Sequence, residues 1–136
     1  DKGGLYLTAD TAETILVRQK EIYDGALPSG NAIALLNLSK LAKLLAHKEY
    51  EGKAQRMRKT FADKIMKAPS MYTQFLCGVD FLLEPYYEIV IAGKQHSADT
   101  QEMLKTLNHH YLPSKIVLLV TPENQKELSK ISESIP

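Results

Sequence analysis

The spacing of the apolar residues changes at Glu84-Pro85, and this change is what most constrains the fold. Upstream of it, apolar residues recur every three or four positions, as they do on one face of an α-helix. Downstream, two short apolar and β-branched runs, 87–92 and 115–120, bracket a helical pattern near 98–111. The sequence therefore predicts a mainly α protein with an α/β tail. We expect an antiparallel helical array in a domain over residues 1–84, and a β-α-β-α unit in a second over 85–136.

Three helices are expected in the first part, over 31–47, 50–67 and 71–83. The first is apolar around so wide an arc that we expect it to face two neighbours. The side chains expected to face water are mainly Asn37, Ser39, Lys40, Lys43 and His47. On the second helix, apolar residues at steps of three and four are expected to form one stripe toward the first: Tyr50, Ala54, Met57, Phe61 and Ile65.

The ends of the other helices have local signals. Pro69 is expected to end the second helix, because proline cannot donate a helical hydrogen bond, and Ser70 is expected to cap the third. A last helix is expected over 122–131, where Pro122 suits the first turn. The third helix carries the only cysteine, Cys77, which is expected to be a small buried hydrophobe. A single cysteine excludes an intramolecular disulfide and a multi-cysteine zinc site.

The segment before the first helix holds two apolar runs, 5–8 and 15–17, with a turn-like connection over 8–13. They predict an antiparallel hairpin, and a helix over 9–17 is the alternative. Residues 18–31 then form what we call the polar loop. A loop this polar, attached to a buried helix, is where a site would be built. Its candidate ligand-binding residues are Arg18, Lys20, Tyr23, Ser29 and Asn31, of which Ser29 or Asn31 is also the expected helix cap.

Glu21 and Asp24 are the two carboxylates of the polar loop and its candidate catalytic residues. Glycoside hydrolysis needs such a pair, as acid and base or nucleophile. The competing interpretation is structural, and it is the one we favour. In that interpretation Glu21 pairs with Arg18 or Lys20, and Asp24 holds the turn at Gly25 by accepting hydrogen bonds from backbone amides.

The polar loop also carries a resemblance. Its pattern Arg-x-Lys-Glu-x-Tyr-Asp-Gly-Ala-x-Pro-Ser-Gly-Asn, preceded by Gly-Gly-Leu-Tyr-Leu-Thr-Ala-Asp at 3–10, resembles the C-terminal part of the spermatogenesis-associated, thioredoxin-domain-containing protein family. The resemblance extends to about residue 120, and residues 121–136 do not match the family's tail. It implies a piece of a helical toroid similar to six-hairpin glycosidases and sugar epimerases, without the thioredoxin-like domain. The polar loop would then lie at the mouth of a cavity for a sugar or polyol.

Two other patterns have the residue types of a site. Residues 93–97 lie between a predicted strand and a predicted helix, where α/β units bind phosphate through helix N-terminal amides. The turn has neither dinucleotide nor P-loop glycine spacing, and Ser97 as a helix cap explains it equally well. His109 and His110 are adjacent on a helix and point about 100° apart, so they cannot easily share a metal. No metal site and no cofactor is predicted.

The charges exclude some partners. With 17 basic and 16 acidic residues, no strong field exists to attract nucleic acid or an anionic membrane. A basic stripe on the second helix is expected to be a solvated face: Lys53, Arg56, Arg58, Lys59, Lys64 and Lys67. No apolar run approaches the ~20 residues of a membrane span, and no signal peptide is recognised. We expect a cytoplasmic chain, cut from a longer protein because it starts at Asp1.

Three functions follow from these patterns. In the parent protein, the chain would be part of a toroid that binds a sugar or polyol. By itself, it would be a non-catalytic segment whose apolar helix faces pack against the rest of the parent chain or against a second copy. The third is a small phosphate- or nucleotide-binding α/β module. We prefer the second for these 136 residues, because their helices are too apolar for so small a unit.

Overall fold

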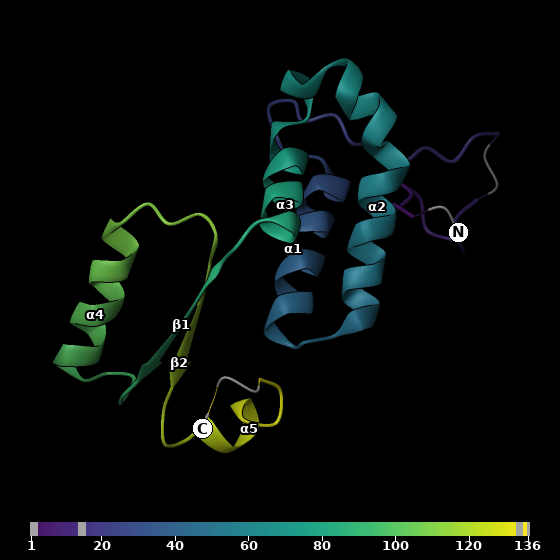
Figure 1. Ribbon diagram of the computed structural model, residues 1–136. Coiled ribbons are helices and arrows are strands. Elements are labelled where there is room, and N and C mark those ends of the chain that lie inside the picture. The colour runs from purple at the N-terminus through teal and green to yellow at the C-terminus, as the bar shows by residue number, and fades with distance from the viewer. Residues whose placement is uncertain (1–2, 14–15, 133–134, 136) are drawn as a thin grey trace. The chain divides into compact units, whose positions relative to one another are not determined.

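A computed structural model describes residues 3–13, 16–132 and 135 (Figure 1). The chain divides into two compact units, which are described separately. The first unit comprises the described residues of 1–43 and 47–84, and the second those of 44–46 and 85–136. The expected assignment of residues 1–84 and 85–136 to two domains stays a prediction.

The first unit is built from three helices that alternate in direction (Figure 1). They are α1 (Gly30–Leu44), α2 (Lys48–Lys67) and α3 (Thr73–Leu83), and a 3-10 turn, η1 (Pro69–Met71), joins the last two. The predicted mainly α class with an α/β tail is confirmed. None of the helices in the described ranges is long and apolar enough to cross a membrane.

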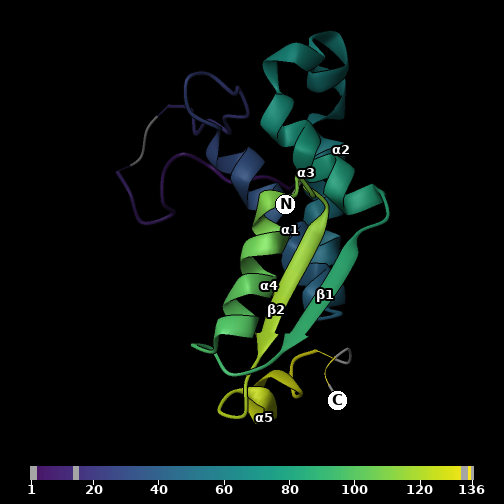
Figure 2. The same cartoon turned by 90° about the vertical axis from the view of Figure 1, so that its left-hand side faces the viewer.

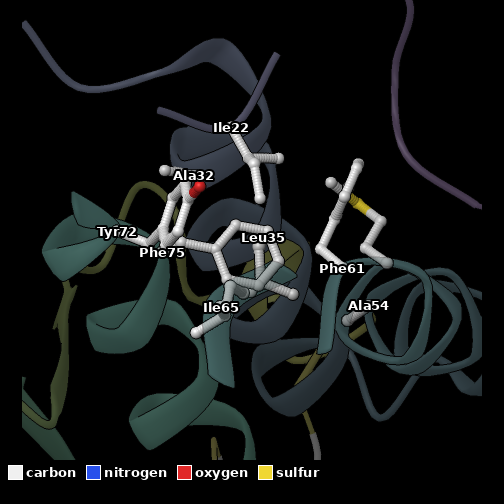
Figure 3. Close-up of a cluster of buried hydrophobic side chains, with 9 residues drawn as sticks. Ile22, Ala32, Leu35, Ala54, Phe61, Ile65, Tyr72 and Phe75 are labelled. Atoms are coloured by element: carbon white, nitrogen blue, oxygen red, sulfur yellow. The ribbon is translucent and has the colours of Figure 1, made fainter. Parts of the chain in front are cut away.

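The core of the first unit lies between these helices and includes one residue of the polar loop, Ile22 (Figure 3). The rings of Phe61 and Phe75 meet edge to face, with their centroids 5.7 Å apart, a favourable aromatic geometry. The predicted apolar stripe of α2 is confirmed at four of its five positions. The fifth, Tyr50, is only half-buried. The buried members are Ala54, Met57, Phe61 and Ile65.

Small residues bring α1 close to α3. Ser39, expected to face water, is completely buried, so that expectation was wrong. Its hydroxyl donates to the carbonyl of Leu35 at 2.8 Å, which satisfies it without a solvent contact. Gly78 lies opposite: a Cβ built on it would approach Leu35 Cγ to 3.0 Å and the Leu36 nitrogen to 3.1 Å. Ser39 is therefore buried because the contact admits only small side chains.

Several helix boundaries and exposures in the first unit differ from the expectations. Helix α1 ends at Leu44 rather than His47, because the reversal into α2 places Ala46 at a positive φ of 47°. Helix α3 starts at Thr73 rather than Met71, and Ser70 does not cap it but lies in η1. Cys77 is exposed rather than buried, because it lies on the solvent side of α3 with Thr73 and Asp80.

The predicted hairpin does not form in the described residues before α1. Residues 3–13 and 16–29 contain no strand, and they do not form the alternative helix either. Thr14 and Ile15 lie outside the described residues. One backbone hydrogen bond, from Leu7 N–H to Gln19 O at 2.9 Å, joins the two arms. The expected turn between them is present, closed by Ala12 N–H to Ala9 O at 3.1 Å.

The second unit contains the predicted strand, helix and strand. Strands β1 (Tyr87–Ala92) and β2 (Lys115–Val120) are parallel neighbours, with Tyr87 opposite Lys115 and Ala92 opposite Val120 (Figure 2). Helix α4 (Ala98–His109) connects them and ends two residues before the expected boundary. The last helix, α5 (Gln125–Leu128), is shorter than the expected 122–131.

A side-chain turn explains the late start of α5. Asn124 accepts a hydrogen bond from Thr121 N–H at 2.8 Å and donates to Leu119 O at 3.1 Å. These bonds hold residues 121–124 in a turn that replaces the first helical turn expected at Pro122.

The close approach at Gly78 predicts opposite effects for one substitution at two helical glycines. Gly78→Ala should destabilise the first unit by about 1–3 kcal/mol through overpacking, despite the better helix propensity of alanine. The matched control, Gly52→Ala in α2, meets only a flexible arginine nitrogen at 3.4 Å and should stabilise by up to ~1 kcal/mol. Denaturant unfolding of both variants measures the difference, and equal effects would contradict the packing described here.

Candidate functional site

Asp24 joins the polar loop to the start of helix α3. Its Oδ1 accepts a hydrogen bond from Ser29 N–H at 2.9 Å. Its Oδ2 accepts from the backbone N–H groups of Gln74 at 2.9 Å and Phe75 at 3.1 Å. The first amides of a helix have no partner inside the helix, so Asp24 caps α3 from 50 positions earlier in the chain. Its own N–H donates to Met71 O at 3.0 Å.

Lys43 acts on the opposite end of the same helix. Its ammonium donates to the carbonyls of Phe81 and, at 3.0 Å, of Glu84. It also lies 4.9 Å from the centroid of the Phe81 ring. Burial lowers the pKa of Lys43, and the nearby carboxylate of Asp80 opposes that shift. Helix α3 thus has a carboxylate at its N-terminus and an ammonium at its C-terminus, the arrangement that its macrodipole favours.

Asn31 fixes the segment that precedes the polar loop. Its Oδ1 accepts from Leu5 N–H at 2.6 Å, and its Nδ2 donates to Leu5 O at 2.9 Å and to Glu21 O at 2.7 Å. The side-chain amide therefore pairs with both polar backbone groups of Leu5, as a neighbouring strand would. Ser29, not Asn31, is the cap of α1, because its Oγ accepts from Ala32 N–H at 3.2 Å.

Glu21 binds the backbone amides of the two residues that follow it. Its Oε1 accepts from Tyr23 N–H at 2.6 Å and from Ile22 N–H at 2.7 Å. The bond from Tyr23 is the main cause that lowers the pKa of Glu21, against the raising effect of partial burial, and the bond from Ile22 adds to it. Glu21 was expected to pair with Arg18 or Lys20, but Arg18 forms an ion pair with Asp10, and Lys20 donates to the carbonyl of Gly3.

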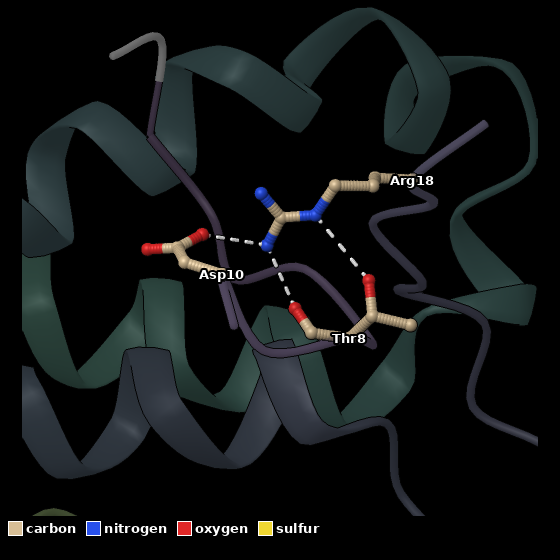
Figure 4. A network of polar contacts seen from close by, with 3 residues as sticks. All are labelled: Thr8, Asp10 and Arg18. Atoms are coloured by element: carbon tan, nitrogen blue, oxygen red, sulfur yellow. Dashed lines mark hydrogen bonds and ion pairs between the residues drawn. The ribbon is translucent and has the colours of Figure 1, made fainter. Parts of the chain in front are cut away.

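Arg18 and Lys20 bind the N-terminal segment. The guanidinium of Arg18 forms an ion pair of 2.8 Å with Asp10 and donates to Thr8 O at 2.7 Å and Thr8 Oγ1 at 3.3 Å (Figure 4). Arg18 and Lys20 both lie over the ring of Tyr6, at 4.2 and 4.4 Å from its centroid. The pair with Asp10 is exposed and contributes little to stability.

Most candidate residues therefore bind backbone groups of the polar loop, of the N-terminal segment or of α3. Tyr23 is about half exposed, and among the other candidate residues only Arg18 is exposed too. Within the described ranges, every buried side-chain nitrogen or oxygen has a hydrogen-bond partner. The same ranges contain no group of three His, Cys, Asp or Glu side chains able to hold a metal ion. The catalytic roles of Glu21 and Asp24 and the ligand-binding roles stay predictions.

The second unit has a cavity where the strands end. It has a volume of about 570 Å³ and combines the turn after β1 with the turn after β2. Ser97 occupies the cap position of α4, but its hydroxyl donates to Lys94 O at 2.8 Å and lies 2.8 Å from Thr100 Oγ1. The sequence indicated only one side of this cavity. The lining residues that the sequence analysis did not identify follow β2: Thr121, Glu123 and Asn124. They could have been found from the rule that the carboxyl ends of neighbouring parallel strands lie at the same edge of the sheet.

Comparison with known proteins places the chain beside longer relatives. No protein-family model matches it. It is 26% identical over 129 residues to spermatogenesis-associated protein 20 of Rattus norvegicus, covering 94% of this chain and 16% of the relative. The Mus musculus protein is 25% identical over 131 residues, covering 95% and 17%, and the Homo sapiens protein is 24% identical over 129 residues, covering 94% and 16%. The chain spans about a sixth of the length of these relatives, so it is similar to one segment of each.

The bridging role of Asp24 predicts a loss of stability on substitution. Both carboxylate oxygens accept from N–H groups, so in Asp24→Asn the amide NH₂ must face one set of donors. We expect a loss of about 1–3 kcal/mol, measured by thermal or denaturant unfolding. Ser29→Ala should cost about 1 kcal/mol, and the exposed control Asp63→Asn should stay within about 0.5 kcal/mol. An Asp24 variant as stable as that control would contradict the capping role.

The hydrogen bonds of Glu21 predict a pH dependence. Because the pKa is lower in the folded protein, the stabilisation is complete above the unfolded value near 4.5 and is lost as the pH falls through the folded pKa. Glu21→Gln should therefore be less stable than the unchanged protein at neutral pH, and this difference should shrink in acid. Unfolding curves at a series of pH values measure it, and a difference independent of pH would refute the role assigned to the charge.

Proposed function

We propose that the first unit is a non-catalytic packing and interaction segment of a longer protein. The observation that carries this proposal is the exposure of large apolar side chains before α1. Leu7, Val17 and Leu27 are 65%, 66% and 80% exposed, whereas Ile33 and Leu41 on α1 are about 40% exposed. The partner surface therefore involves the N-terminal segment and the polar loop more than the helix faces.

The use of the polar side chains supports the same proposal. The side chains of Asp24, Asn31 and Glu21 form hydrogen bonds with backbone groups of this chain. Such contacts build a scaffold and leave little capacity for proton transfer to a substrate. The similarity to one-sixth of much longer proteins agrees with a segment that packs against other parts of its parent.

Within a longer protein, we further propose that the polar loop borders a site for a sugar or polyol in a helical toroid, in the cytoplasm. Tyr23 is the loop residue best suited to touch such a ligand, because its aromatic ring remains half exposed. The rest of the loop would act as the support that holds this ring in position.

Sedimentation of the 136-residue chain tests the packing proposal. Exposed apolar side chains that lack their partner should promote self-association, so the sedimentation coefficient should rise with concentration. The double substitution Leu7→Ser and Val17→Ser should abolish this rise without lowering the unfolding temperature. Tyr111→Ser in the second unit, at an apolar residue that is even more exposed, is the control and should leave the rise intact. A chain that stays monomeric over the whole concentration range, or a control as effective as the double variant, would contradict the proposal.

Ligand binding by a longer protein that contains this chain tests the sugar proposal separately. Tyr23→Ala should weaken the affinity for a bound sugar on the order of tenfold, about 1.4 kcal/mol, without a change in stability. Tyr50→Ala, on α2, is the aromatic control and should leave the affinity unchanged. Calorimetric titration measures both, and equal affinities for the three proteins would exclude Tyr23 from the site.

The cavity at the strand ends supports a second candidate, a phosphate- or nucleotide-binding module. Lys94 and His96 line it beside the start of α4, where helix amides favour anions. Glu123 lines the same cavity and opposes an anion. Titration with inorganic phosphate should shift the amide resonances of Ser97 and Ala98 if this candidate is right, and unchanged resonances at millimolar phosphate would exclude it.

A further inference from the structure

Strand β1 has one edge that no other strand covers. Tyr87 N–H donates to Ser114 O and Gly93 N–H to Val120 O, each at 2.9 Å. The N–H and C=O of one strand residue point to the same side, and this side alternates along the strand. The odd-numbered residues therefore face β2, and the polar backbone groups of Glu88, Val90 and Ala92 face away from it. In the described part of the chain the sheet has two strands only, so no strand pairs with this side, which we call the open edge.

A groove lies between β1 and α4. It has a volume of about 490 Å³ and touches the consecutive residues Ile89, Val90 and Ile91. These three residues are the middle of β1, so the groove lies next to the part of the strand where the backbone groups of Val90 face away from β2. The residues of α4 that complete it are Asp99, Glu102, Met103, Thr106 and Leu107.

The composition of the groove indicates what it can hold. Met103 is more than half exposed in it, and two carboxylates, Asp99 and Glu102, lie one helical turn apart at its side. An occupant should thus present apolar side chains to Met103 and basic ones to the carboxylates. A second copy of β1 would bring Glu88 instead and has no lysine or arginine of its own in Tyr87–Ala92, so charge disfavours a symmetric pair.

We propose that the open edge of β1 binds an extended segment of another polypeptide, which adds a third strand and carries Lys or Arg beside Asp99 and Glu102. Backbone hydrogen bonds to Glu88, Val90 and Ala92 provide the pairing, and the groove selects the side chains. Two parallel strands alone form a poor sheet. A third strand would also cover the exposed backbone groups of β1. This inference concerns the second unit and does not depend on the function proposed for the first.

Hydrogen exchange with a designed peptide tests the pairing. The probe is a short peptide with the repeat Val-Thr-Lys-Thr, which places Val and Lys on one face of a strand. Its addition should slow exchange at least about tenfold at the amides of Glu88, Val90 and Ala92. The amides of Ile89 and Ile91 already face β2 and should be slow with or without the peptide. Equal protection of odd- and even-numbered amides, or no protection at saturating peptide, would overturn the proposal. Protection that rises with protein concentration in the absence of peptide would also overturn it.

Charge reversal and proline substitution test the specificity. A matched peptide with the repeat Val-Thr-Glu-Thr should bind more weakly than the lysine peptide, and Glu102→Lys should reverse that preference. Val90→Pro removes an outward N–H, which an edge strand tolerates, and should abolish binding of the lysine peptide while the unit stays folded. Equal binding of both peptides to the unchanged protein would overturn the proposal even if the proline variant failed to fold.

Discussion

Helix α3 is held at both ends by charged side chains that lie outside it, and the first unit depends on this arrangement. With 11 residues, α3 is too short to be stable as an isolated helix. Asp24 satisfies its first amides and Lys43 its last carbonyls. Because Asp24 also binds Ser29 N–H, the carboxylate links the start of α3 to the residue that caps α1. One side chain therefore connects the starts of the two helices whose apolar faces pack together.

The polarity of residues 18–31 has a structural cause. The described residues before α1 form neither helix nor strand, so their backbone groups lack the partners that regular structure supplies. Side chains take that place: Asn31 pairs with Leu5, Glu21 with the two amides that follow it, and Arg18 with Thr8. A segment of this kind needs many polar residues at defined positions, and in a sequence it is indistinguishable from a binding loop.

The sequence predicted the features that depend on residues close together in the chain. The stripe of α2 and the two strands follow from apolar spacing, and the interior positions of Ala54, Phe61 and Ile65 follow with them. The exposure of Cys77 and the burial of Ser39 could not be predicted, because both depend on how α1 and α3 are rotated against each other. The contact of Asp24 with α3 joins residues 50 positions apart, and no spacing rule connects them. The hairpin failed because a side-chain amide, rather than a second strand, satisfies Leu5.

Hydrogen exchange at the first turn of α3 tests this account most directly. The first amides of a helix without a cap exchange fast, because they have no intrahelical acceptor. If Asp24 caps α3, the amides of Gln74 and Phe75 should exchange as slowly as those in the middle of the helix, near Gly78. Fast exchange at Gln74 and Phe75, with slow exchange at Gly78, would contradict the account.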